Sequence, residues 1–386
     1  MKKILFILFL CLVKANLAAF TLSPEARISL LTCAPGEEVY AKFGHTAIRV
    51  NDAANGIDEV FNYGIFDFSS DSFLYRFIKG ETDYMLGTTS FDYLVWEYEN
   101  RHSAVVEQVL NLTEEEKQNL FDALIVNSLP ENRVYRYNYF FDNCSTRPRL
   151  MVEQAVGNIF YQELNNNTKN SFRNEIYRLV GKNTWLGFGI DLLIGSEADL
   201  PFESKESLFL PDNLMLAFEN AQINRWGEVQ PLVAEERFIV EGMAGQASND
   251  NGFSPVVAFW LLCFAVLVLS FLFYRKNKRG VWLDMLLFGA VGLAGCLIAF
   301  LVFFSVHPAV NPNYNLLWAQ PLHLLFALIL PFKALKKWQQ YYAAANAFVL
   351  LGTLIFYAFI PQQFNPAFFP LILCLLVRSL FLAPRL

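Results

Sequence analysis

Hydrophobic residues are distributed unevenly along the chain, and the first cluster lies at the N-terminus. An uncharged apolar run from Ile4 to Val13 follows two lysines and is followed by Lys14 and several small residues. This order is typical of a secretory signal peptide. A run of this length is too short to cross a bilayer, which requires about 20 residues. We therefore predict a signal peptide over residues 1–19.

The C-terminal third of the chain contains the longer apolar runs. We predict five transmembrane helices, at about residues 256–274, 281–306, 316–332, 341–360 and 367–382. Pro321 interrupts the third run, and Arg378 lies near the end of the fifth. Residues 255–386 are therefore expected to form an all-α membrane domain.

Basic residues alternate between the loops that join these runs. The loops at 275–280 and 333–337 are rich in lysine and arginine, whereas those at 307–315 and 361–366 have none. Basic loops are retained in the cytoplasm. The pattern predicts a multi-pass protein of the bacterial inner (cytoplasmic) membrane with residues 20–254 in the periplasm, in agreement with the signal peptide.

Residues 20–254 carry the shorter periodicities of a mixed α and β domain. Strands are predicted at 41–50, 59–66, 105–112 and 135–141, where β-branched and aromatic residues alternate with polar ones. A capping box at Thr113 predicts a helix to about Asn127, and a second helix is expected from about residue 142 to Val156, capped by Asn143 or Ser145. The pattern of residues 165–250 indicates a mixture of helix and loop. Residues 242–254 are small and polar and are predicted to form a linker into the membrane domain.

Composition supports this division into two parts. The chain is 54% hydrophobic and 17% charged, whereas soluble domains carry about 25% charged residues. Residues 256–386 have a net charge of +8 and residues 1–255 one of −14. An acidic exported domain does not indicate a nucleic-acid partner. The sequence also has no metal-ligand spacing, phosphate loop or dinucleotide motif, so we expect no metal and no cofactor.

Two cysteines lie in the exported domain, and they allow two interpretations. A Cys33–Cys144 disulfide is the simpler one for an exported pair. Alternatively, Cys144 is a nucleophile, because a helix N-terminus and the nearby Arg147 favour a thiolate. His45, at the start of a predicted strand, would then be its base.

The motifs around these residues resemble a known family. Gly44-His45-Thr46-Ala47 followed by Asn143-Cys144 is similar to the permuted NlpC/P60 papain-like fold, which includes lecithin:retinol acyltransferase-like enzymes, in which histidine precedes cysteine. Longer segments resemble the Bacteroides-type (Lnb-like) lipoprotein N-acyltransferases: Leu31-Thr-Cys-Ala-Pro-Gly, Phe43-Gly-His-Thr-Ala-Ile-Arg-Val, Phe61-Asn-Tyr-Gly-Ile-Phe-Asp, Asp142-Asn-Cys-Ser-Thr-Arg-Pro and Asn313-Tyr-Asn-Leu-Leu-Trp-Ala-Gln-Pro-Leu-His. The resemblance covers about residues 25–155 and the apolar runs.

This resemblance implies an acyl transfer between two membrane lipids. A phospholipid acyl chain would pass to Cys144 as a thioester and then to the α-amino group of a diacylglyceryl-cysteine lipoprotein. His45 would move the protons, and Asn62, or secondarily Asp67, would orient its ring. Backbone N–H groups at the start of the helix are candidates for an oxyanion hole. Cys33 would be a second acyl carrier, a resolving partner or a structural thiol.

The loop at 307–315, which the pattern of basic residues places in the periplasm, is unusually polar for a short connection. We consider five residues as candidates for contact with lipid headgroups: His307, Asn313, Asn315, Trp318 and His323. The alternative is an interfacial loop with an aromatic belt residue.

Two other functions use the same residues differently. The first is a membrane-anchored NlpC/P60-like cysteine peptidase or amidase acting on cell-wall peptides. The second is a non-catalytic membrane scaffold braced by a Cys33–Cys144 disulfide. An apolar groove that leads from the membrane to Cys144 would favour the acyltransferase, whereas a polar cleft facing away from it would favour the peptidase.

Overall fold

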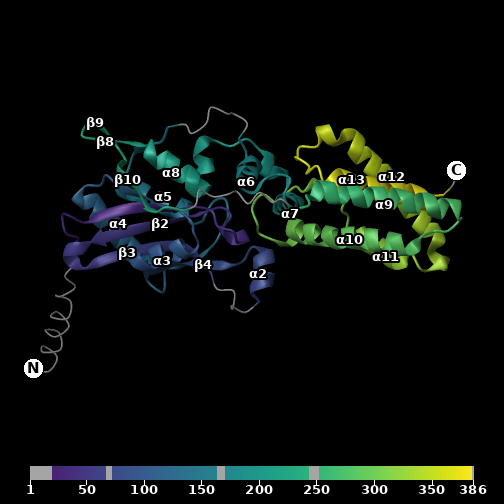
Figure 1. Cartoon of the computed structure of the whole chain (residues 1–386), viewed down its shortest axis with the longest axis horizontal. Helices are drawn as coiled ribbons and strands as arrows, with labels where there is room; N and C mark the ends of the chain where they lie inside the picture. The colour runs from purple at the N-terminus through teal and green to yellow at the C-terminus, as the bar shows by residue number, and fades with distance from the viewer. Residues whose placement is uncertain (1–19, 67–71, 163–169, 243–251, 385–386) are drawn as a thin grey trace, which may run out of the picture.

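The computed structural model describes residues 20–66, 72–162, 170–242 and 252–384 (Figure 1). A sheet-rich N-terminal domain and a helical C-terminal domain lie end to end, which gives the molecule an elongated shape. The predicted signal peptide and most of the predicted linker lie outside the described residues.

Seven antiparallel strands form the main sheet of the N-terminal domain, which has an α+β fold. In spatial order they are β10 (Val233–Val240), β5 (Val105–Leu110), β1 (Arg27–Cys33), β2 (His45–Asp52), β3 (Ile57–Ile65), β4 (Asp83–Ser90) and β6 (Val134–Arg136). A smaller sheet contains β7 (Ile159–Phe160), β8 (Gln222–Arg225) and β9 (Glu228–Pro231).

Helices cover both faces of the main sheet. Ile48 and Val50 of β2 face the core with α4 (Glu114–Ser128), α5 (Thr146–Val156) and α8 (Pro211–Glu219). Ala47 of β2 and Val60 of β3 face the opposite core, which includes α3 (Phe91–Asn100). Successive strand residues point to opposite faces, so the central strands are buried on both sides.

Several predicted elements have different boundaries in the structure. The strand predicted at 41–50 begins only at His45, because a 3-10 turn at Val39–Ala41 precedes it. The aromatic strand predicted at 135–141 was wrong beyond Arg136, where a turn closed by an Asn138–Asp142 bridge takes over. Residues 165–250 contain strands as well as helices, and β1 and β4 were not predicted.

The C-terminal domain contains five main helices. They are α9 (Pro255–Arg275), α10 (Val281–Phe304), α11 (Leu322–Ile329), α12 (Lys336–Phe356) and α13 (Phe368–Leu382). Among the described residues, three helices are long and apolar enough to cross a membrane, at Pro255–Arg275, Val281–Phe304 and Lys333–Phe359. Pro321 separates α11 from the short turn at Tyr314–Leu317, so the third predicted span is shorter than expected.

A buried polar cluster joins the two domains. Arg173 of α6 (Phe172–Val180) forms salt bridges with Asp199 and with Asp191 of α7 (Trp185–Leu193). Asp191 also accepts a 2.8 Å hydrogen bond from Asn365, in the loop between α12 and α13. Both predicted outer loops therefore contact the N-terminal domain, since Gly195 N–H also donates to the Ala309 carbonyl.

A second buried ion pair lies at the opposite end of the helical domain. Arg378 donates to Asp284 at 2.6 Å, and both side chains are fully buried. Arg378 also donates to Ser270 of α9. Arg378, which the sequence places near the end of the fifth apolar run, thus joins α9, α10 and α13.

Candidate active site

The start of β2 fixes the position of His45. Gly44 has a φ of 76°, and a Cβ atom there would lie 2.8 Å from the Cys33 carbonyl oxygen. A residue with a side chain would be strained in this left-handed conformation and would meet the backbone of β1. Gly44 therefore lets the chain turn sharply into the strand, with His45 as its first residue.

Cys144 lies in the turn that leads into α5, two residues before its first helical residue. Asn143 organises this turn: its Oδ1 accepts hydrogen bonds from the amides of Ser145 and Thr146, at 2.8 and 2.9 Å. Its amide donates to the carbonyls of Tyr139 and Phe209. Asn143 thus performs the capping that the sequence assigned to Asn143 or Ser145.

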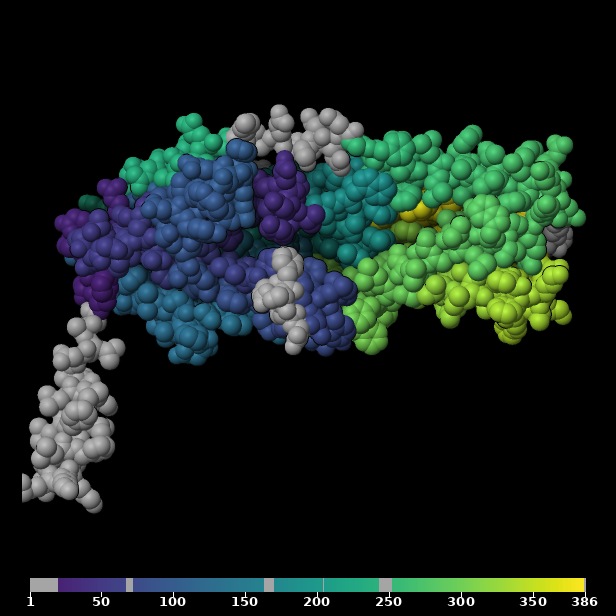
Figure 2. Space-filling model, turned by 60° about the horizontal axis from the view of Figure 1, so that its bottom comes forward, coloured from purple at the N-terminus to yellow at the C-terminus, as the bar shows by residue number. Residues whose placement is uncertain are grey.

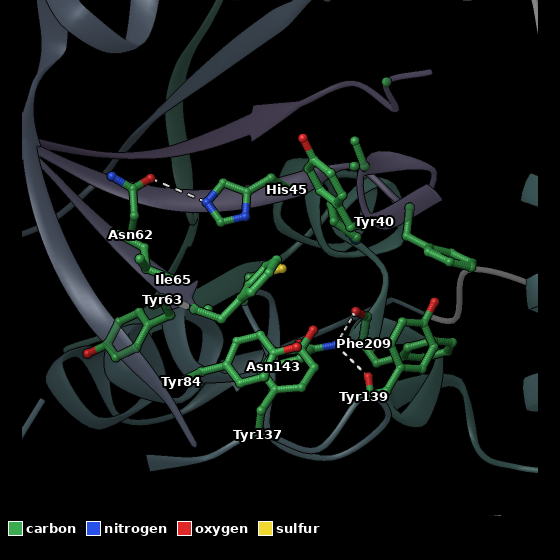
Figure 3. Close-up of a pocket in the computed structure, with 18 of the residues that line it drawn as sticks. Tyr40, His45, Asn62, Tyr63, Ile65, Tyr84, Tyr137, Tyr139, Asn143 and Phe209 are labelled. Atoms are coloured by element: carbon green, nitrogen blue, oxygen red, sulfur yellow. Dashed lines mark hydrogen bonds between the residues drawn. The ribbon is translucent and has the colours of Figure 1, made fainter. Parts of the chain in front are cut away.

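His45, Cys144 and Asn62 meet at one end of the sheet. His45 Nε2 donates to Asn62 Oδ1 at 3.3 Å (Figure 3). Asn62 lies on β3, beside β2, and is buried. This bond leaves Nδ1 of the same ring for Cys144, with which His45 shares a side-chain hydrogen bond.

The contact changes the protonation of both groups. Burial opposes the Cys144 thiolate, but the hydrogen bond and charge of His45 outweigh it, so the pKa of Cys144 is lowered. Burial likewise opposes the charged ring, but Cys144 and Asn62 outweigh it and raise the pKa of His45. Both shifts favour a thiolate–imidazolium pair.

A bulge at Gly64 makes room for this arrangement. The pairing of β3 with β4 shifts register between Tyr63 and Ile65. Gly64 has a φ of 96°, and a Cβ atom there would contact the Cys144 Cβ at 3.6 Å. Bulges of this kind are common beside active sites, because they re-aim the side chains next to them.

A large apolar cavity opens onto these three residues. Its volume is about 690 Å³, and its walls are mainly aromatic and aliphatic. Tyr63, Tyr84 and Tyr137 lie on the side of β3 and β4 (Figure 3). The cavity also reaches Val306 and His307, in the loop that follows α10. Residues of the helical domain therefore form part of its wall.

The described residues contain no group of three or more His, Cys, Asp or Glu side chains that could hold a metal ion. The side chains of His45, Asn62 and Cys144 provide an imidazole, an amide and a thiol at the cavity wall.

Comparison with known families assigns both domains. Residues 16–180 match the Lnb N-terminal periplasmic domain, and residues 247–384 match the Lnb transmembrane domain. The chain belongs to the Lnb family. Neither a curated protein nor a solved structure matches it. Membership indicates a membrane-anchored enzyme that modifies lipoproteins, with its N-terminal domain in the periplasm.

Cys33 is a free thiol in this Lnb-family chain. Cys33 lies opposite His45 in the antiparallel pairing of β1 with β2. Neither Cys33 nor Cys144 forms a disulfide bond. The disulfide interpretation is therefore wrong. Burial, despite a hydrogen bond to Tyr98, raises the pKa of Cys33 to about 12. The Cys33 thiol is therefore protonated at neutral pH, and its pKa is shifted in the opposite direction to that of Cys144.

Two further residues near Cys144 were considered from the sequence. Arg147 forms a salt bridge with Asp142 at 2.6 Å, and its guanidinium lies 3.5 Å from the centre of the Tyr135 ring. These contacts direct its charge to Asp142. Asp67 lies outside the described residues.

The candidate lipid-binding residues separate into two groups. His307 lines the cavity, and its Nε2 donates to the Phe77 carbonyl at 2.7 Å. The other four are buried and do not line it: Asn313, Asn315, Trp318 and His323.

Hydrogen bonds explain the position of this buried group. The Asn315 amide donates to the Asp191 and Leu192 carbonyls of α7, and Trp318 Nε1 donates to Asn315 Oδ1. His323 bonds to the Trp318 carbonyl and the Tyr342 hydroxyl. These contacts hold the outer loop against α7 and give the group a structural role.

The sequence did not identify Gly64 or Phe77 as parts of the site. The positive φ of Gly64 depends on the bulge in β3, and Phe77 reaches the cavity from α2 (Phe73–Lys79). In the sequence, the one signal for a bulge at this place was Gly64 itself, which directly follows Asn62 and Tyr63.

Proposed function

We propose that this protein is a lipoprotein N-acyltransferase that carries the acyl chain on Cys144. The donor is a phospholipid and the acceptor is a diacylated lipoprotein. The observation that carries the proposal is the Cys144–His45–Asn62 arrangement at an apolar cavity whose wall includes the loop after α10. The order of the residues also fits the permuted papain-like fold, because His45 precedes Cys144 in the chain.

In the first half-reaction, the Cys144 thiolate attacks the ester carbonyl of the phospholipid. The new C–S bond forms a tetrahedral adduct, and the C–O bond to the glycerol then breaks. The departing alkoxide takes the proton of the His45 imidazolium, which leaves a lysophospholipid and an acyl thioester. Asn62 holds the ring so that Nδ1 faces the sulfur throughout.

In the second half-reaction, a neutral lipoprotein amine attacks the thioester carbonyl. His45 Nδ1 takes one proton of the amine as the C–N bond forms. The C–S bond breaks, and the thiolate–imidazolium pair is restored. The amides of Ser145 and Thr146 are bonded to Asn143, so we assign the oxyanion contact to the amide of Cys144 itself.

The architecture suits substrates that stay in a bilayer. We propose a cleaved signal peptide at 1–19, a periplasmic domain at 20–254 and five spans at 255–386 in the inner membrane. Both outer loops contact the N-terminal domain, which supports the alternation of basic loops. A peptidase acting on the cell wall has no need of a cavity built partly by the membrane domain, and free thiols argue against the disulfide-braced scaffold.

The test is to express the chain in bacteria whose lipoproteins are diacylated and to weigh an N-terminal lipoprotein peptide. We expect a third acyl chain with the wild type, and none with Cys144→Ala or His45→Ala. Cys33→Ala is the matched control and retains the product, because the buried thiol is protonated. Unchanged peptide mass with well-expressed wild type would refute the acyltransferase.

A further inference from the structure

The short helix α2 presents large apolar side chains outward from the N-terminal domain. Leu74 is 69% exposed and Tyr75 is 56% exposed, and Phe77 is also exposed. Burying such groups in an apolar medium is favourable, because it removes apolar surface from water. The basic side chains of the same helix are neutralised by neighbours, Arg76 by Asp83 and Lys79 by Glu81. The helix is therefore amphipathic, and much of its apolar side is left exposed by the described part of the chain.

This helix is attached to the end of a transmembrane helix. Val306 N–H donates to the Lys79 carbonyl at 2.9 Å, and His307 Nε2 donates to the Phe77 carbonyl. The rings of Tyr75 and Phe300 lie 6.4 Å apart. In Figure 2, the dark blue side chains of this region lie against the green side chains at the end of α10.

The contact with Phe300 sets the depth of α2 relative to a bilayer. α10 has 24 residues, which corresponds to a length of about 36 Å, slightly more than the roughly 30 Å hydrocarbon core. Phe300 lies one turn before the end of α10, and the exposed Phe303 and Phe304 follow it. The apolar side of α2 is thus continuous with the lipid-facing surface of α10, at the level where the hydrocarbon core ends.

The cavity of Cys144 reaches the same junction. Phe77 and Gly80 line it on the side of α2, and Val306 and His307 line it on the side of the loop after α10. These are the residues that join the two elements. The junction therefore connects the apolar interior of the site with the surface that faces lipid.

We propose that α2 inserts into the periplasmic leaflet and forms one wall of a lateral entrance to the Cys144 cavity. An acyl chain would leave the bilayer beside α2 and reach the thiol without crossing water. The insertion follows from the exposed side chains and their continuity with α10, whereas the use of the entrance by a phospholipid rests on the proposed function.

Insertion is tested with full-length protein in phosphatidylcholine vesicles. Leu74→Trp adds one indole on α2, and Ile125→Trp adds one at an exposed apolar position of α4 as the control. The tryptophan fluorescence of each variant is compared with that of the wild type in vesicles whose lipids carry bromine, a quencher, at shallow or deep acyl positions. We expect the emission added at position 74 to be quenched, most strongly by shallow bromines, and that added at 125 to be unaffected. Equal, weak quenching at both positions would overturn the insertion.

The entrance is tested by acylation of Cys144 from two donors. Replacing Leu74 and Tyr75 by aspartate is expected to slow thioester formation from bilayer phospholipid by about tenfold or more, while p-nitrophenyl butyrate, which arrives from water, still acylates Cys144 at the wild-type rate. The matched control replaces Ile125 and Val126 of α4 by aspartate, and we expect it to change neither rate. Equal loss with both donors would overturn the entrance. Wild type that is acylated by neither donor would refute the proposed function instead, and the quenching would still decide the insertion.

Discussion

At the scale of single residues, the structure gives two cysteines opposite reactivities. Cys144 contacts His45 and Thr46, which together lower the pKa of its thiol despite burial. Cys33, on β1, is fully buried, whereas Cys144 is partly exposed to the cavity; Cys33 is close to Tyr98, and burial raises its pKa. The difference arises from the groups that each thiol touches, because burial alone would raise both pKa values.

Alkylation by iodoacetamide should therefore be selective and depend on pH. We expect Cys144 to react with a midpoint below the ordinary value for a free cysteine, about 8.5, while Cys33 stays unmodified at neutral pH. In His45→Ala the stabilising contact is lost and burial remains, so the midpoint rises and alkylation at pH 7 slows by about tenfold or more. Mass spectrometry of the two peptides measures both rates. An unchanged midpoint in His45→Ala would contradict the ion pair.

Asn62 is expected to act as a positioning residue for His45. Asn62→Ala removes the hydrogen bond to Nε2, which should lower the rate of acyl transfer by about ten- to a hundredfold with little change in KM. That bond also raises the pKa of His45, so the ring loses its proton at lower pH in the variant.

The pH profile separates positioning from damage. If departure of the glycerol requires the imidazolium, the alkaline limb of acylation moves to lower pH in Asn62→Ala. Asn62→Asp keeps the accepting oxygen and should recover most of the rate. If the rate of acylation fell equally at all pH values in Asn62→Ala, and Asn62→Asp did not restore it, the defect would be a general structural one.

At the scale of elements, buried ion pairs and a buried amide hold the helices that carry no catalytic group. Arg173 and Asp191 are completely buried and connect α6 with α7, and Asn365 links this pair to the helical domain. A buried charge that loses its partner costs about 3–5 kcal/mol. An exposed pair is worth about 0–1 kcal/mol.

This contrast can be measured on a single helix. Arg173→Met should lower the melting temperature of the detergent-solubilised protein markedly, because it leaves Asp191 and Asp199 without their cation. Arg178→Met, five residues further along α6, removes a pair with Asp212 that is more than a third exposed. It also removes a contact with Glu175, but this carboxylate keeps hydrogen bonds from Asn170 and Asn213, so Tm should change much less. Similar shifts for both variants would contradict a structural role for the buried cluster.

At the scale of the whole molecule, the two domains contact each other through loops at one end of the helical domain. The loops at 305–315 and 361–366 contact the N-terminal domain, whereas Arg279 and Gln339 meet at the other end of the helices. Five spans would account for this alternation. The periplasmic domain would then be held at a fixed height above the bilayer.

Fusions of alkaline phosphatase, which is active only in the periplasm, test this topology. We expect activity after residues 312 and 363, and none after residues 278, 337 or 384. Positive charges in the inner loops retain those segments in the cytoplasm. Immunoblots control for expression of each fusion. Activity after residue 337 would mean that the third apolar run does not span, and the five-helix topology would be wrong.

The sequence by itself determined the features that depend on local chemistry or on hydropathy. It separated an exported α+β domain from an apolar helical domain, and its capping box at Thr113 begins α4 as expected. It also selected His45, Asn62 and Cys144, since the motifs around them could be compared with a known family. These features need only short stretches of chain, so no knowledge of distant contacts was required.

Only the tertiary structure decided how distant segments use their polar residues. Asn315 and Trp318 were equally consistent with lipid contact, but Asn315 donates to α7 carbonyls more than a hundred residues away, and Trp318 donates to Asn315. Likewise β5 is buried on both faces, so its pattern does not show which strands flank it. The pairing of Arg378 with Asp284, the free state of Cys33 and the junction of α2 with α10 all follow from long-range packing, which local periodicity does not encode.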